Sequence, residues 1–127
     1  MKKDKILIIE DEIELGNALK IILELKGFDV VVANRGKDGL DFAKSNSISL
    51  ILCDVHLPDI SGYDILKAIR IDESIQHIPL IFMTAFAEEH EMEEVGAPCL
   101  IKPFTSRDLI ATVTKQLESK QPRTEPA

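Results

Sequence analysis

Short apolar runs alternate along this chain with apolar residues at helical spacing, and this alternation restricts the fold more than any other feature. Strand-like runs lie at residues 5–9, 28–33, 48–53, 79–83 and 100–101. Helical stripes lie at residues 15–25, 40–43, 65–69 and 109–117. This alternation predicts an α/β fold with a parallel sheet, because each helix carries the chain back to the start of the next strand. The runs are almost wholly apolar, so we expect helices on both faces of the sheet.

The composition indicates a single domain. The chain has 127 residues, 45% of them hydrophobic, which is enough for one domain with a real core. Its net charge of −7 argues against nucleic-acid binding, since phosphate contacts need clustered Lys and Arg. No apolar stretch approaches the roughly 20 residues that cross a bilayer, and no signal-peptide core follows the lysines at residues 2–5. Cys53 and Cys99 form no CxxC pair. We therefore expect a reduced, cytoplasmic protein without membrane contact.

Asp54 is the most informative single residue. It follows the apolar run 48–53 and opens the turn at residues 55–62. A carboxylate at the end of a buried strand is unfavourable unless something pairs with it. Polar residues also follow the other strand-like runs: Glu10 and Asp11 the first, Thr84 the fourth and Lys102 the fifth. In a parallel sheet these positions gather at one edge, where open α/β proteins bind their ligands.

Carboxylates, a hydroxyl and an ammonium at one edge predict a site for Mg²⁺ and a phosphoryl group. Mg²⁺ prefers oxygen ligands and keeps several waters. The predicted metal ligands are the carboxylates of Glu10, Asp11 and Asp54 and the backbone carbonyl of His56. With the metal bound, Asp54 can attack phosphorus as a nucleophile. Thr84 and Lys102 would take up charge on the phosphoryl oxygens.

Each of these residues also has a simpler interpretation when it is taken alone. Acids favour helix starts, Asp favours turns before Pro, and Thr favours helix N-caps. Glu10 and Asp11 could therefore only start a helix, Asp54 could be a turn residue, and Thr84 could be a helix N-cap. Lys102 could be a solvated lysine. Their coincidence at four strand ends favours the site.

Four motifs resemble the receiver domain of bacterial two-component response regulators, including the single-domain chemotaxis regulator. They are IIEDE at residues 8–12, CDVHLPDISG at 53–62, MTA at 83–85 and IKPF at 101–104. The resemblance covers about residues 4–119. It implies a flavodoxin-like three-layer sandwich with strand order 2-1-3-4-5 and a cis bond before Pro103. Residues 1–119 would form the receiver domain. The polar residues 120–127, which include two prolines, read as a disordered tail or linker.

The resemblance also implies a function. In that family the aspartate matching Asp54 accepts phosphate from a phosphohistidine on a sensor kinase. The acids matching Glu10 and Asp11 hold Mg²⁺, and the residues matching Thr84 and Lys102 contact the phosphoryl group. Such a protein phosphorylates and dephosphorylates only itself, so it is not an enzyme with other substrates. Its partners would be a sensor histidine kinase or phosphotransfer protein and a downstream protein or fused output domain. Whether this is a free-standing regulator or part of a longer chain stays open.

Three other functions are alternatives to this one. A pseudo-receiver would keep the fold and regulate a partner without phosphate. A phosphohydrolase of the haloacid-dehalogenase type would need an Asp two residues after its nucleophile, where this chain has His56. A flavodoxin-like cofactor binder would need a Gly/Ser/Thr-rich phosphate loop after the first strand, which is missing.

The sequence departs from the family pattern in three places. Glu10 stands where Asp is usual, and Cys99 stands where an aromatic is usual. The stretch between Thr84 and Lys102 is shorter than usual. Its residues 88–94 are rich in glutamate with few apolar anchors. We therefore expect the family's fourth helix to be shortened or disordered.

These departures predict that phosphorylation changes the order of residues 86–97 instead of moving an aromatic ring, since Cys99 has no ring to move. The alternative is a short loop without a signalling role. Hydrogen exchange with and without Mg²⁺ and beryllofluoride separates the two. We expect large protection changes confined to residues 86–97, and none in Asp54→Asn. Unchanged exchange in this segment, with changes elsewhere on the surface, would rule the order switch out.

Overall fold

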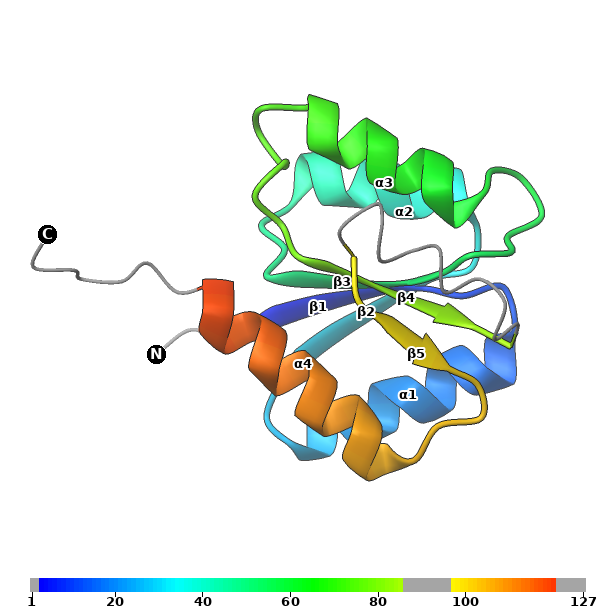
Figure 1. The fold of residues 1–127 in the computed structure, drawn as a ribbon, viewed down its shortest axis with the longest axis vertical. Coiled ribbons are helices and arrows are strands. Elements are labelled where there is room, and N and C mark those ends of the chain that lie inside the picture. The colour runs from blue at the N-terminus through cyan, green and yellow to red at the C-terminus, as the bar shows by residue number, and fades with distance from the viewer. Residues whose placement is uncertain (1–2, 86–96, 121–127) are drawn as a thin grey trace, which may run out of the picture.

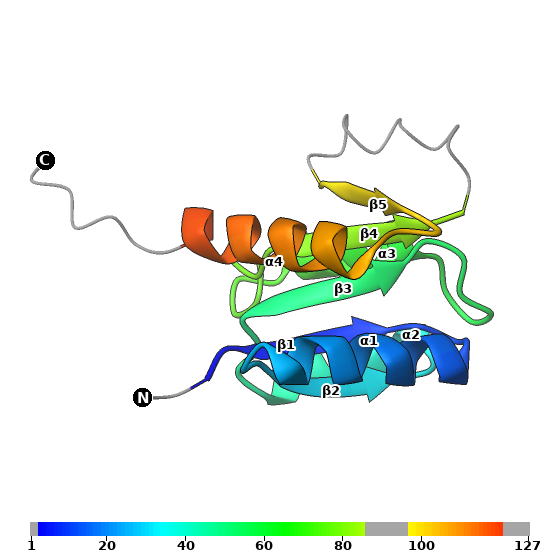
Figure 2. The same ribbon diagram turned by 90° about the horizontal axis from the view of Figure 1, so that it is seen from below.

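The computed structural model describes residues 3–85 and 97–120 (Figure 1). Within them, five parallel strands form one sheet in the order β2-β1-β3-β4-β5, as predicted. The strands are β1 (Lys5–Ile9), β2 (Asp29–Ala33), β3 (Leu50–Asp54), β4 (Leu80–Thr84) and β5 (Cys99–Ile101). The helices are α1 (Ile13–Leu25), α2 (Gly36–Ser45), α3 (Gly62–Ile71) and α4 (Ser106–Lys120). The arrows in Figure 2 all point the same way, so the carboxyl ends of the strands share one edge.

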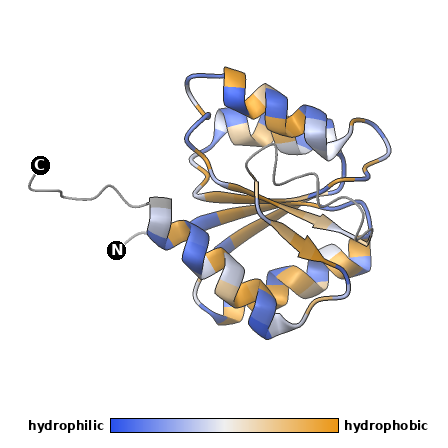
Figure 3. Cartoon of the chain, in the orientation of Figure 1, coloured by the Kyte–Doolittle hydropathy of each residue, from blue (hydrophilic) through white to orange (hydrophobic). Residues whose placement is uncertain are grey.

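Side chains of each strand alternate between two apolar cores, because successive residues of a strand face opposite sides of a sheet. Leu7 and Phe82 pack in the core under α2 and α3. Ile6 and Met83 pack in the core under α1 and α4. All four side chains are fully buried. Figure 1 shows the two helix layers, and Figure 3 shows the apolar sheet between them. The predicted three-layer sandwich is confirmed.

Turn and cap residues fix one end each of α1, α3 and α4. Gly27, just past α1, has a φ of +96°, which glycine adopts without strain. The Asp64 N–H donates to Ser61 Oγ at 3.1 Å at the start of α3. The Asp108 N–H donates to Thr105 Oγ1 at 3.0 Å at the start of α4. The cis peptide bond between Lys102 and Pro103 is also present.

The buried face of the first helix differs in part from the apolar stripe at residues 15–25. Ala18 and Leu25 belong to that stripe but are exposed, Leu25 to 82%, whereas Leu23 is fully buried. The buried face of α1 follows Gly16, Leu19 and Leu23. Leu25 lies about 200° further round the helix than Leu23 and so points away from the sheet.

Two predictions lie outside the described residues. The shortened or disordered fourth helix and its order switch fall almost wholly on residues 86–96. Of the tail predicted at residues 120–127, Lys120 is instead the last residue of α4, and residues 121–127 lie outside the described residues. Among the helices of residues 3–85 and 97–120, none has the length and apolar character that a membrane crossing requires.

Candidate functional site

Three charged side chains from distant parts of the chain meet at the carboxyl edge of the sheet. Glu10 follows β1, Asp54 ends β3 and Lys102 follows β5. The Lys102 Nζ donates to Glu10 Oε1 at 2.9 Å, across 92 residues, and to Asp54 Oδ2 at 3.0 Å, across 48 residues. Glu10 is 0% exposed and Asp54 6% exposed. One ammonium therefore holds two buried carboxylates, a strong charge-assisted contact.

Burial and charge act against each other in this triad. Burial raises the pKa of Glu10 from its ordinary 4.5 to about 7, although the Lys102 ammonium and the Glu12 N–H both oppose that rise. For Lys102, burial alone would lower the pKa, but its hydrogen bonds to Glu10 and Asp54, together with the negative charges of these two acids, outweigh burial and raise it. Lys102 therefore stays charged at neutral pH, and Glu10 lies close to its titration point.

A third carboxylate lies beside the triad. Asp11 is exposed next to Glu10. One oxygen from each of Glu10, Asp11 and Asp54 lies within 4.8 Å of the other two. Three carboxylate oxygens at this spacing suit a hard divalent cation such as Mg²⁺. The chemistry of the residues present therefore fits the predicted metal.

The backbone around Asp54 and Thr84 holds the site in place. The His56 N–H donates to Asp54 Oδ1 at 3.0 Å, so the two Asp54 oxygens have different partners, an amide and the Lys102 ammonium. Thr84 is fully buried at the end of β4, and its carbonyl accepts the Lys102 N–H at 2.7 Å. Asp54 and Thr84 end their strands instead of following them, because both still pair in register with a neighbouring strand.

The structure thus brings together four of the predicted site residues. Glu10, Asp54 and Lys102 are in contact, and Asp11 borders them. The simpler interpretation of Lys102 as a solvated lysine is wrong, since its side chain is only 16% exposed. The helix-start interpretation of Glu10 is compatible with the site, because Glu10 Oε2 also accepts the Glu12 N–H at 3.2 Å where α1 begins.

Sequence reasoning missed the part that Asp59 plays. Its carboxylate accepts backbone N–H groups of Gly36 and Lys37, both at 2.9 Å, and so joins the loop after β3 to α2. Pro58 and Asp59 read only as a turn, and no local pattern relates them to residues 22 and 23 positions earlier.

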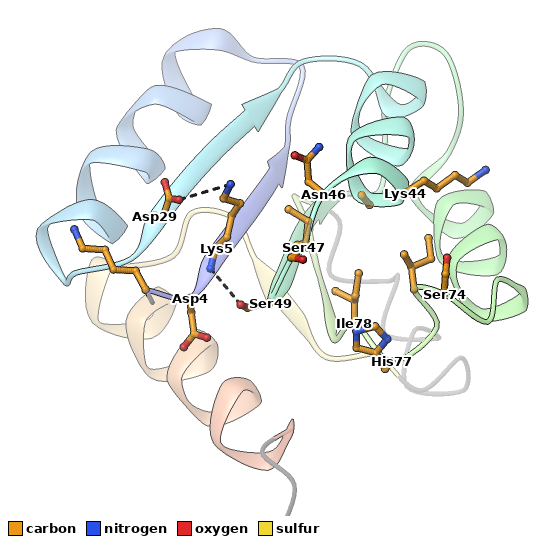
Figure 4. Close-up of a pocket in the computed structure, with 14 residues that line it drawn as sticks. Asp4, Lys5, Asp29, Lys44, Asn46, Ser47, Ser49, Ser74, His77 and Ile78 are labelled. Carbon is orange, nitrogen blue, oxygen red and sulfur yellow. Dashed lines mark hydrogen bonds and ion pairs between the residues drawn. The ribbon is translucent and has the colours of Figure 1, made fainter. Parts of the chain in front are cut away.

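A polar cavity of about 730 Å³ lies at the opposite edge of the sheet (Figure 4). Lys5, Ser49 and His77 are among the residues that line it. Lys5 Nζ lies 3.8 Å from Asp29 Oδ2, and the Lys5 N–H donates to Ser49 Oγ at 3.2 Å. None of the predicted site residues lines this cavity.

Comparison with known proteins gives a consistent result. The family model of the response regulator receiver domain matches residues 6–114. The CpxR homolog of Haemophilus influenzae is 40% identical over 113 residues, 86% of this chain and 48% of that protein. The polar-differentiation response regulator DivK of Brucella ovis is 33% identical over 117 residues, 88% of this chain and 94% of that protein. This chain therefore spans about half the length of the CpxR homolog.

Solved structures agree with the sequence comparisons. The chemotaxis response regulator CheY4 of Vibrio cholerae superposes with a TM-score of 0.83 and 26% identity, over 90% of this chain and 98% of that one. The receiver domain of the sensor histidine kinase PA1611 of Pseudomonas aeruginosa, with a magnesium ion coordinated in its active site cleft, gives a TM-score of 0.84 and 26% identity. That match covers 92% of this chain and 99% of the other.

The raised pKa of Glu10 predicts a pH-dependent stability of the metal-free protein. Between about pH 4.5 and 7 the folded chain binds a proton on Glu10 that the unfolded chain lacks, so stability falls as pH rises through this window. We expect Glu10→Gln to reduce that loss by about 1–3 kcal/mol. Denaturant unfolding at pH 5 and pH 8 with a chelator measures it, and Glu14→Gln, at an exposed position of α1, is the control. Equal pH dependence in the wild type and Glu10→Gln would contradict the prediction.

Proposed function

Since the chain belongs to the response regulator receiver domain family, we propose that it accepts a phosphoryl group on Asp54 in two-component signalling. One observation carries the proposal. The Asp54 carboxylate is held at the carboxyl edge of the sheet between the Lys102 ammonium and the His56 N–H, with Glu10 and Asp11 beside it. That arrangement presents a nucleophile with charge-stabilising groups already in place.

Mg²⁺ is the cofactor that we propose for this site. The carboxylates of Glu10, Asp11 and Asp54 would hold it, with the His56 backbone carbonyl as a further ligand, and the spacing of the carboxylates supports this. The PA1611 receiver domain, which coordinates a magnesium ion in its active site cleft, supports it by analogy. When bound, the ion supplies positive charge against the phosphoryl oxygens.

In the proposed transfer, an Asp54 oxygen forms a bond to phosphorus as the bond from phosphorus to the donor nitrogen breaks. The electron pair of that bond stays on the donor's imidazole. Lys102, already 3.0 Å from Asp54, and Thr84 at the end of β4 would take up charge on the phosphoryl group. Water would later hydrolyse the acyl phosphate. The chain would thus act only on itself and would not be an enzyme with other substrates.

We propose a sensor histidine kinase or a phosphotransfer protein as the phosphoryl donor. Part of the surface beside the site is apolar, which favours a protein donor. Ile13, two residues past Asp11, is 63% exposed. An apolar groove of about 470 Å³ runs between α1 and α4 and reaches Lys102. We propose residues 1–120 as the receiver domain, one residue past the predicted boundary because α4 runs to Lys120, with residues 121–127 as a tail or linker and a cytoplasmic location. The output would be a downstream protein or a fused domain.

The first test concerns the acceptor. With acetyl phosphate and Mg²⁺, intact-mass measurement should show one added phosphoryl group on the wild type. We expect none on Asp54→Asn, because the amide is a poor nucleophile, and normal labelling of the control Asp64→Asn, at an exposed site in α3. Thermal unfolding checks that the variants fold. Labelling that persists in Asp54→Asn would show that Asp54 is not the phosphoryl acceptor. An unlabelled wild type would indicate a pseudo-receiver, and steady donor hydrolysis a phosphatase.

The second test concerns the metal. Mg²⁺ binds the folded site and not the unfolded chain, so it should stabilise the wild type by about 1–3 kcal/mol at concentrations well above Kd. Asp11→Ala should remove most of this gain and Glu10→Ala somewhat less, whereas Glu14→Ala should keep it. Thermal unfolding with and without Mg²⁺ measures the gain. An unchanged Mg²⁺ response in Asp11→Ala would show that the metal site is misassigned.

A further inference from the structure

We infer that Asp59 is a positioning residue for the phosphoryl acceptor, because it fastens the loop that orients Asp54 to the first turn of α2. The inference rests on the proposed acceptance of phosphate at Asp54. It assigns a role to a residue outside the predicted site, one that lies in the loop between β3 and α3.

The contact between Asp59 and α2 is bidentate. The Gly36 N–H donates to Asp59 Oδ1 and the Lys37 N–H to Asp59 Oδ2, both at 2.9 Å. The first N–H groups of a helix have no partner within the helix, and the side chain of Arg35, the N-cap of α2, makes no capping hydrogen bond. The hydrogen bond from Lys37, followed by that from Gly36, lowers the pKa of Asp59. Asp59 therefore caps α2 as an anion, which the positive helix N-terminus favours.

Two glycines show how closely the loop is held at both ends. A Cβ on Gly36 would lie 2.4 Å from Ile60 Cγ2, so the loop packs directly on the start of α2. A Cβ on Gly62 would lie 2.6 Å from the Asp54 carbonyl oxygen. The Gly62 N–H also donates to the Val55 carbonyl at 2.8 Å. The loop is thus fixed against β3 at its base and against α2 at Asp59.

His56 lies between these two attachments. Its N–H donates to Asp54 Oδ1 at 3.0 Å, and its carbonyl is one of the ligands proposed for Mg²⁺. The other Asp54 oxygen is held by Lys102. Releasing Asp59 from α2 would free the outer part of the loop and loosen the His56 backbone. Asp59 would therefore set the orientation of one acceptor oxygen and one metal ligand without touching either.

The test compares Asp59→Ala and Asp59→Asn with two controls. Asp59→Asn keeps one acceptor oxygen and should be intermediate. The first control, Asp38→Ala, removes an exposed acid from the first turn of α2. The second, Val113→Ala, destabilises the core on the other face of the sheet. Hydrogen exchange is measured at the Gly36, Lys37 and His56 amides, and thermal unfolding gives the stability of each variant. The rate of labelling by acetyl phosphate is measured as a function of Mg²⁺ concentration, at a temperature well below the Tm of every variant.

In Asp59→Ala we expect faster exchange at all three amides. At limiting Mg²⁺ we also expect labelling about tenfold slower than in the wild type, because losing a group that orients metal ligands weakens metal binding by about this factor. The Mg²⁺ concentration that gives half the maximal labelling rate should be higher for the same reason. Both controls should label at the wild-type rate, although Val113→Ala loses stability.

Unchanged exchange at His56 in Asp59→Ala would overturn the inference, and so would faster exchange with unchanged labelling. A wild type that takes no label would instead refute the proposed function, and with it the role of Asp59 in phosphorylation. The exchange data would still show in that case whether Asp59 holds the loop.

Discussion

The ammonium of Lys102 is the contact on which the carboxyl edge of the sheet depends. It lies 2.9 Å from a Glu10 oxygen and 3.0 Å from an Asp54 oxygen, and both acids are buried. Without it, two carboxylates would share a desolvated pocket with no cation. Removing one partner from a buried ion pair typically costs about 3–5 kcal/mol. Lys102 is itself anchored through its N–H to the Thr84 carbonyl, so the end of β5 is tied to β4 and, through the side chain, to β1 and β3.

The same contact links the stability of the protein to its proposed chemistry. Buried ion pairs are weak sources of net stability, because desolvation offsets most of the attraction. Burial raises the pKa of Glu10, as desolvation of a carboxylate does. A cation near Glu10, Asp11 and Asp54 would relieve it, and an anionic phosphoryl group would give the Lys102 ammonium a further partner. A site in which two buried carboxylates share one ammonium would therefore favour both ligands, as expected where function and stability compete.

The site combines a rigid base with loops that other elements hold. Asp54 and Thr84 belong to strands buried on both faces, so the positions of their backbones are set by the sheet. The loop after β3 has no such support of its own. Its position depends on the glycine contacts and on the Asp59 carboxylate at α2. Precise geometry in a loop requires this kind of support from outside the loop.

By itself, the sequence determined the order of strands and helices, the two-sided sheet and the residues at its carboxyl edge. Those features follow from local periodicity and from the rule that parallel strands end together. Only the tertiary structure decided that Lys102 bridges Glu10 and Asp54, that Leu25 faces outward and that Asp59 caps a helix 22 residues before it. The Lys102 bridge and the Asp59 cap join residues far apart in the chain. The exposure of Leu25 depends on the exact rotation of α1 against the sheet. No local pattern records separations or rotations of this kind, because they are set by packing between elements.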